Sequence, residues 1–346
     1  MSNTNRRQFI CMAIGAGSAV GLGAAGWWMQ RASLADAEAG LADQPWQPVT
    51  RTSWALGSEV SFTVLHPRSD VADAAITAAL GELELVEELM SIYRPNSQLC
   101  RLNREGVIDD AHPYLLQVLQ YAQSISRRTE GAFDITVQPL WALYAAAQKA
   151  GQLPDPAAIA ATRKTINWRR VEITPPRVQL HGSRAEVTLN GIAQGFAADR
   201  AMAALRQHGV QQALVNTGEI GCLGQKSPGD PWTVGIQHPR RADAFISLAR
   251  LDGRCLATSG DYATSFSHDH RYNHLFDPRT GDSPQELASV SIAARTAMQA
   301  DALSTAVFVL GAEKGLQLIQ STPQADGFLV LKDGSVLATD GFPQIV

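Results

Sequence analysis

The feature that most constrains the fold is a series of consecutive strand patterns between residues 212 and 260. Parallel neighbours would need a helical crossover between them, and no helical periodicity separates these segments. This pattern favours an α+β fold over a doubly wound sheet. The segments are "QALVN" (212–216), "WTVGIQH" (232–238), "FISLARL" (245–251) and the start of "RCLATSGDYATSF" (254–266).

Other segments alternate between helix and strand. Apolar residues recur at helical spacing in 69–90, 112–129, 192–209 and 299–311, the last ended by Gly311. Strand patterns are expected at 60–66, 185–191 and 287–294, and a hairpin at 327–339 that turns on Asp333-Gly334. Residues 151–165 are expected to form a surface excursion.

The N-terminus has the order of an export signal. Arg6 and Arg7 precede a weakly apolar run at 10–29, and small-residue cleavage sites follow at 35–39. This pattern predicts a twin-arginine signal over 1–39, a periplasmic location and one domain over 45–346. An uncleaved membrane anchor is the alternative, because the apolar run is long enough to span a bilayer.

Charge and cysteine content exclude some classes of function. The net charge is −4, without a basic stripe, so we expect no nucleic-acid partner. Cys11 lies in the predicted signal, and the remaining cysteines show neither a CxxC motif nor metal-ligand spacing. We expect Cys100, Cys222 and Cys255 to be mainly core residues.

Two stretches, one on a predicted helix and one at a predicted helix start, can each be interpreted as a ligand site or as ordinary helix structure. Asp301 and Thr305 are four residues apart and share a helix face, where a carboxylate and a hydroxyl can bind Mg²⁺. Spacing alone favours the structural alternative, in which Thr305 bonds the helix backbone and Asp301 lies near the N-terminus. Gly191 and Gly195 in "TLNGIAQG" (188–195) can bring backbone to a phosphate at a helix start, or form a tight turn.

Three histidines occur in "SHDHRYNH" (267–274). His268 and His270 would share a face of a strand, as zinc ligands do, but no cysteine or Glu-x-x-His partner completes a set. A polar hairpin tip with His274 placed separately is the favoured interpretation.

In their order along the chain, seven stretches resemble one family, the FAD:protein FMN transferases or ApbE flavin transferases. The resemblance runs from about residue 50 to 346, nearly all of the predicted mature chain. The stretches are "MSIYRPNSQLCRLN", "EGAFDITVQPL", "LNGIAQGFAADRA", "LVNTGEI", "ATSGDY", "YNHLFDPRTG" and "ADALSTAVFVLG".

The resemblance implies transfer of FMN from FAD to a Ser or Thr hydroxyl of a target flavoprotein, with release of AMP. It implies a mixed α/β fold of antiparallel sheets and packed helices, with an FAD cleft between two lobes. It places Mg²⁺ at Asp301, Thr305 and a backbone oxygen of Gly191, which reverses the expectation from spacing. His274 is implied as the base, with Asp301 as the second catalytic residue. FAD is implied near Leu56, Tyr93, Ala132, Phe133, Asp134, Thr188, Gln194, Ser259, Gly260 and Leu275.

The chain departs from the family pattern at three places. The family commonly has an acidic residue at Thr188, Lys or Glu at Gln194, and a second glycine before the acid of Gly218-Glu219. Thr188 and Gln194 keep a non-catalytic FAD-binding or delivery protein open as an alternative. An FAD pyrophosphatase, in which water replaces the acceptor hydroxyl, is a second alternative that the family resemblance allows. With the predicted signal, "TLNGIAQGFAADR" is similar to the NosX branch linked to nitrous-oxide respiration, whose acceptor is a membrane-bound NosR-type protein.

Overall fold

The computed structural model describes residues 46–345, so the predicted export signal at 1–39 lies outside the described residues. The fold is α+β, as the sequence predicted. Its centre is an eight-stranded sheet in which every pair of neighbours is antiparallel. The strand order is β1 (Gln47–Ala55), β2 (Ser58–His66), β6 (Gln212–Asn216), β7 (Ile220–Leu223), β10 (Cys255–Gly260), β11 (Leu287–Ala294), β12 (Asp326–Leu331) and β13 (Val336–Ala338).

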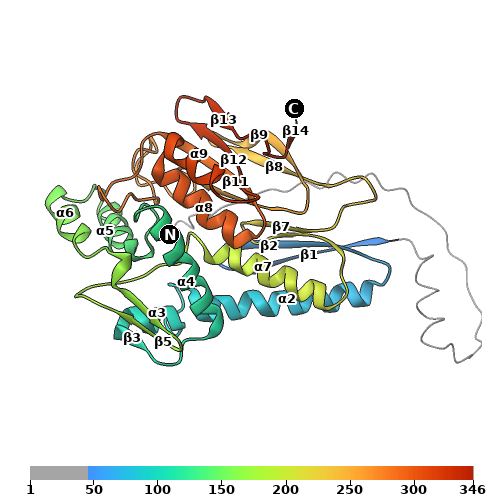
Figure 1. Ribbon diagram of the computed structural model, residues 1–346, viewed down its shortest axis with the longest axis horizontal. Coiled ribbons are helices and arrows are strands. Elements are labelled where there is room, and N and C mark those ends of the chain that lie inside the picture. Colours follow the sequence, from blue (N-terminus) through green and yellow to red (C-terminus); the bar gives the residue numbers. More distant parts are fainter. Residues whose placement is uncertain (1–45, 346) are drawn as a thin grey trace, which may run out of the picture.

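One face of this sheet is covered by helices (Figure 1). Helices α2 and α7 run side by side beneath the β1–β7 part, and α8 and α9 cover the β10–β12 part. The apolar stripes predicted for 69–90 and 299–311 face this core; Ile76, Leu83 and Leu303 are fully buried. The bounds are α2 (Ser69–Met90), α7 (Ala193–Gln207), α8 (Ala297–Leu310) and α9 (Ala312–Gln320).

The opposite face is covered by a second sheet of three strands. These are β8 (Trp232–His238), β9 (Arg241–Leu251) and β14 (Gln344–Ile345). Trp232, Val234 and Leu251 bury their side chains against residues of the central sheet. The strands predicted at 232–238 and 245–251 are thus confirmed, and they form a third layer instead of extending the first sheet.

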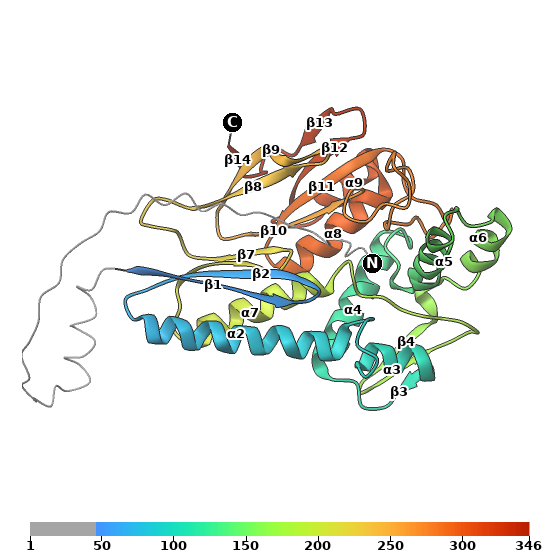
Figure 2. The same cartoon turned by 180° about the vertical axis from the view of Figure 1, so that it is seen from behind.

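A smaller unit lies at one end of these layers (Figure 2). Its helix α6 has no buried residue and begins at the Asp155 cap, so 151–165 is a surface excursion that contains a helix. The unit holds α3 (Gln98–Glu105), α4 (Pro113–Arg128), the 3₁₀ turns η1 (Ile135–Val137) and η2 (Trp168–Arg170), α5 (Gln138–Lys149), α6 (Pro156–Arg163), and the sheet of β3 (Val107–Ile108), β5 (Arg177–Leu180) and β4 (Val171–Thr174).

The predicted strand at 185–191 is wrong. These residues pair with no strand and are held by individual contacts. The Asn103 side chain donates to the Val187 carbonyl and accepts from the Val187 N–H, each at 2.8 Å, and the Thr188 N–H donates to the Ile135 carbonyl at 2.8 Å. Because side-chain and loop groups satisfy this backbone, the segment is extended without belonging to a sheet.

The other predicted helices, the strands at 60–66, 212–216 and 287–294, and the hairpin on Asp333-Gly334 are confirmed. Sequence analysis had missed the strands β1, β3, β4, β5, β7 and β14 and the helices α3, α5, α6 and α9. Among residues 46–345, no helix combines the length and apolar content that a membrane span requires.

Candidate active site

A cavity of about 360 Å³ lies where the layered body meets the smaller unit. The layered body contributes the β1–β2 turn, the end of α2, the start of α7, the segment after β10 and one face of α8. The smaller unit contributes residues between 132 and 141. Its size is in the range of pockets that bind small molecules and cofactors.

Nearly all the site residues expected from the resemblance meet in this cavity. Gly260 is the exception: it is not among the lining residues, and the Tyr262 ring occupies the space beside its Cα. The expected residues that line the cavity are Leu56, Tyr93, Ala132, Phe133, Asp134, Thr188, Gly191, Gln194, Ser259, His274, Leu275, Asp301 and Thr305.

Oxygen atoms gather at one corner of the cavity, where α8 packs against the start of α7. Asp301 is only 3% exposed, and its Oδ2 accepts from the Gly195 N–H at 3.0 Å. Thr305 Oγ1 lies 3.1 Å from Ser259 Oγ, which in turn lies 2.8 Å from Ser304 Oγ. This corner therefore combines one carboxylate with hydroxyl oxygens, the hard donors that Mg²⁺ prefers.

The two glycines of "TLNGIAQG" allow this close helix packing. A Cβ on Gly191 would lie 2.9 Å from Thr305 Oγ1. A Cβ on Gly195 would lie 2.8 Å from Asp301 Cβ and would overlap the Ala297 carbonyl. The Gly191 backbone thus comes next to the Thr305 hydroxyl, as a shared metal site requires, whereas Gly195 makes room for α8.

His274 enters the cavity from the loop after β10. Its main-chain N–H donates to the Thr264 carbonyl at 3.0 Å, and its Nδ1 lies 3.2 Å from the same oxygen. A carbonyl oxygen only accepts, so this contact assigns the ring proton of neutral His274 to Nδ1. Nε2 then carries the lone pair that a general base needs.

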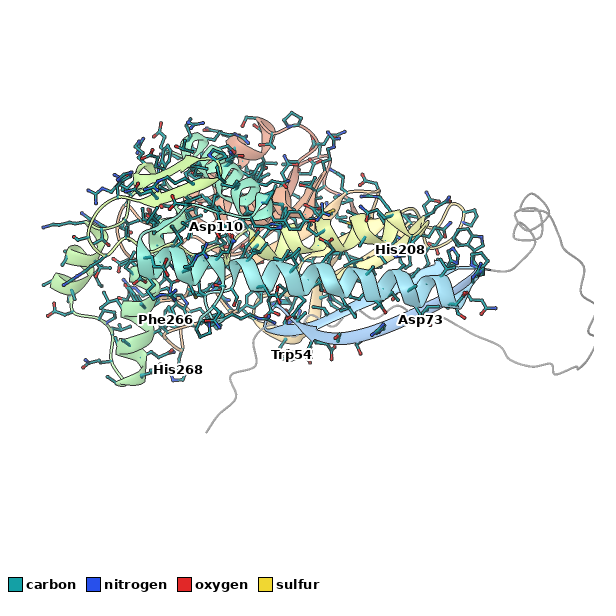
Figure 3. The ribbon with its side chains drawn as sticks, turned by 90° about the horizontal axis from the view of Figure 1, so that it is seen from below. Trp54, Asp73, Asp110, His208, Phe266 and His268 are labelled. Atoms are coloured by element: carbon teal, nitrogen blue, oxygen red, sulfur yellow. The ribbon has the colours of Figure 1, made fainter. Side chains whose placement is uncertain are left out.

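The three histidines do not form one ligand set. Figure 3 shows His268 beside Phe266, at the end of the molecule away from Asp73 and His208. His268 is exposed, while His274 lines the cavity. Among residues 46–345, no group of three or more His, Cys, Asp or Glu side chains is arranged to hold a metal ion.

The turn after His274 is stabilised locally. The Arg279 guanidinium donates twice to the Asp277 carboxylate, at 2.8 Å each, and the Gly281 N–H donates to the Asp277 carbonyl at 2.8 Å. Arg279 therefore pairs within its own turn. Asp277 and its neighbours build the support of the cavity wall.

The departure at Gln194 has a structural explanation. Gln194 Nε2 donates to the Thr217 carbonyl at 3.4 Å, and the Thr217 hydroxyl donates to the Gln194 carbonyl at 3.3 Å. A carboxylate at 194 would face that carbonyl with a second acceptor. Gly218 has φ +97°, and a Cβ there would lie 2.8 Å from Gln194 Nε2. The absence of a side chain at Gly218 therefore leaves room for the Gln194 amide.

Asp134 supports the cavity wall through the hydrogen bonds of its carboxylate. Its Oδ1 accepts from the Thr136 N–H at 2.8 Å, and its Oδ2 accepts from the Trp168 N–H at 3.0 Å. Burial raises the pKa of this carboxyl above its ordinary value, against the lowering effect of these hydrogen bonds. Asp134 thus caps η1 and fixes the neighbouring Phe133 at the cavity.

Lining residues that sequence analysis missed include Arg94, Gln138, Trp141, Asn190 and Thr264. The Trp141 ring meets the Tyr93 ring edge to face, with centroids 6.5 Å apart. Tyr93 is half-exposed, so this aromatic pair forms a wall against which a flat heterocycle can stack. The helical pattern of "QPLWALY" (138–144) was the signal that could have placed Trp141 on a helix face.

Comparisons with known proteins agree with this geometry. The model of the ApbE family matches residues 56–329. An FAD:protein FMN transferase of Klebsiella pneumoniae is 29% identical over 288 residues, which are 79% of this chain and 81% of that protein. One from Treponema pallidum is 32% identical over 296 residues, covering 78% and 81% of the two chains.

Solved structures show the same fold. The flavin transferase ApbE from Vibrio cholerae superposes with a TM-score of 0.76 at 25% identity, covering 87% of this chain and 100% of that chain. The apo form of the Pseudomonas stutzeri flavinyl transferase ApbE gives a TM-score of 0.73 at 29% identity, covering 85% and 95%.

Proposed function

The chain belongs to the ApbE family of flavin transferases, and we propose that it moves FMN from FAD to a Ser or Thr hydroxyl of a target flavoprotein, with Mg²⁺ bound and AMP released. One observation carries this proposal: His274, from the loop after β10, and Asp301 and Thr305, from α8, line one cavity with an aromatic wall. A protein that only binds FAD would need the aromatic wall, but it would need neither the buried carboxylate of Asp301 nor the base His274.

The residues divide the chemistry between them. The acceptor hydroxyl oxygen forms a bond to the FMN-side phosphorus of FAD, and the bond from that phosphorus to the bridging oxygen breaks. AMP leaves with the bridging oxygen, and the hydroxyl proton passes to Nε2 of His274. The Thr264 carbonyl accepts from Nδ1, so Nε2 is the ring nitrogen that receives the transferred proton.

The oxygen corner fits a magnesium ion. The Asp301 carboxylate, the Thr305 hydroxyl and the Gly191 backbone would hold it, because a nearly buried carboxylate is stabilised by a nearby cation. Bound there, Mg²⁺ supplies Lewis-acid stabilisation of pyrophosphate charge. The Gly195 N–H orients Asp301 toward this corner.

We also propose a periplasmic location and a NosR-type acceptor. The Arg6-Arg7 pattern before an apolar run supports export by the twin-arginine route. The similarity of "TLNGIAQGFAADR" to the branch linked to nitrous-oxide respiration supports the acceptor. A protein that receives covalent flavin outside the cytoplasm would meet the transferase in that compartment.

Release of AMP tests the proposed reaction. The mature chain would be incubated with FAD and Mg²⁺, with and without the purified flavin domain of a NosR-type protein. We expect AMP in proportion to the acceptor, and none above background when EDTA is added. AMP released at the same rate without acceptor would instead identify an FAD pyrophosphatase, and intact bound FAD would identify a carrier.

A further inference from the structure

The loop that carries His274 is a short hairpin with an exposed tip. Ser265 and Asn273 form a bridge across it, and the Phe266 N–H donates to the Tyr272 carbonyl at 2.7 Å. His268 and Asp269 at its tip are exposed. A base on such a loop needs something other than sheet pairing to fix its ring.

Asn273 supplies contacts on both sides of His274. It is fully buried, its Nδ2 donates to the His270 carbonyl at 3.3 Å, and its Oδ1 accepts from the Leu275 N–H at 3.0 Å. Ser283 holds its main chain: the Asn273 N–H donates to Ser283 Oγ at 2.9 Å, and that hydroxyl donates to the Asn273 carbonyl at 2.7 Å.

The His270 carbonyl connects this side chain to the central sheet. His270 has φ +57°, in the left-handed region that non-glycine residues rarely adopt. Its carbonyl also accepts from Lys332 Nζ at 3.2 Å, and Lys332 follows β12. Lys332 Nζ lies 3.8 Å from Oδ2 of Asp261, a fully buried residue that Arg240 holds with two hydrogen bonds of 2.6 and 2.8 Å.

We propose that Asn273 is a positioning residue for flavin transfer, which holds the His274 ring in the orientation where Nδ1 meets the Thr264 carbonyl and Nε2 faces the reacting hydroxyl. The inference rests on the proposed role of His274 as the base. Contacts behind a functional imidazole fix both its tautomer and its direction. Lys332 is the second part of this support, because it fixes the carbonyl to which Asn273 donates.

Two variants remove different parts of the support. Asn273→Asp keeps the acceptor for the Leu275 N–H and loses the donor to His270. Lys332→Met keeps the apolar stem and loses the ammonium. Asp269→Ala is the matched control: Asp269 accepts from the Arg271 N–H at 3.0 Å in the same hairpin, but it lies at the exposed tip and has no bond to His274.

The readouts separate positioning from folding. ¹⁵N NMR of ring-labelled protein reports the His274 tautomer, and steady-state transfer with acceptor and FAD reports kcat. We expect wild type and Asp269→Ala to hold the Nδ1–H form. We expect Asn273→Asp and Lys332→Met to show mixed tautomers and kcat reduced on the order of 10-fold to 100-fold. FAD affinity should stay within about 3-fold, because the base acts on the hydroxyl.

Two results would overturn the inference: an unchanged tautomer and kcat in Asn273→Asp and Lys332→Met, or an equal loss in Asp269→Ala. Failure of the proposed function gives a different result. If the wild-type chain transfers no flavin to any acceptor, the proposed function is wrong. The NMR signals of the His274 ring would still show whether Asn273 sets its tautomer.

Discussion

At the scale of single residues, the site depends on two groups with separate tasks. We propose that His274 accepts a proton and that Asp301 holds a cation with Thr305; all three residues line the cavity. Proton transfer to His274 affects only the chemical step. A cation at Asp301 also offsets the negative charge of the bound pyrophosphate. Their variants should therefore fail in different ways.

Replacing His274 by alanine should slow transfer on the order of 10²-fold or more, as loss of a general base does. FAD binding should persist, because the aromatic wall and the oxygen corner remain. Fluorescence titration with FAD and a transfer assay on the same sample check this. Loss of FAD binding would instead make His274 a ligand of the flavin.

Replacing Asp301 by alanine should abolish transfer, and added Mg²⁺ should not restore it at ordinary concentrations. The corner then retains only neutral oxygens, which bind a divalent cation weakly. Transfer measured across a magnesium titration is the check. Turnover equal to that of the wild type would remove the metal assignment.

At the scale of elements, the packing of α7 on α8 determines where Asp301 lies. Gly195→Ala would push a methyl group into the Ala297 carbonyl, which is backbone and cannot move aside. We expect a loss of about 1–3 kcal/mol in the free energy of unfolding, together with loss of transfer. Gly81→Ala is the control: a Cβ there meets nothing within 4 Å in α2, so stability should rise by about 0.5–1 kcal/mol.

The same helix pair carries a pH-dependent contact. Asp199 of α7 accepts from the Ala297 and Met298 N–H groups at 2.8 and 3.0 Å, and burial raises its pKa to about 6. Because the folded chain holds this proton more tightly than the unfolded chain, its stability should fall as pH rises from about 4 to 6. Urea unfolding of wild type and Asp199→Asn at several pH values checks this. The wild type should lose stability relative to the variant across that interval, and a relative gain would contradict the pKa.

At the scale of the whole molecule, the sequence predicted the α+β class, and nearly all of the site residues that the family resemblance implied line the cavity. Strand patterns without intervening helices determine the class, and ordered motifs identify the site. The sequence could not show that β8 and β9 form a separate layer, because alternation is the same in either sheet. It also could not show that Asn103 holds the 185–191 segment outside a sheet, or that Trp141 faces Tyr93, since both contacts depend on distant elements.

The central claim is a covalent transfer, and intact mass spectrometry of the acceptor tests it most directly. A NosR-type flavin domain would be incubated with the mature chain, FAD and Mg²⁺, beside a sample with EDTA. The account predicts a gain of one FMN on a Ser or Thr in the magnesium sample alone. An acceptor of unchanged mass, with FAD cleaved to free FMN and AMP, would contradict it.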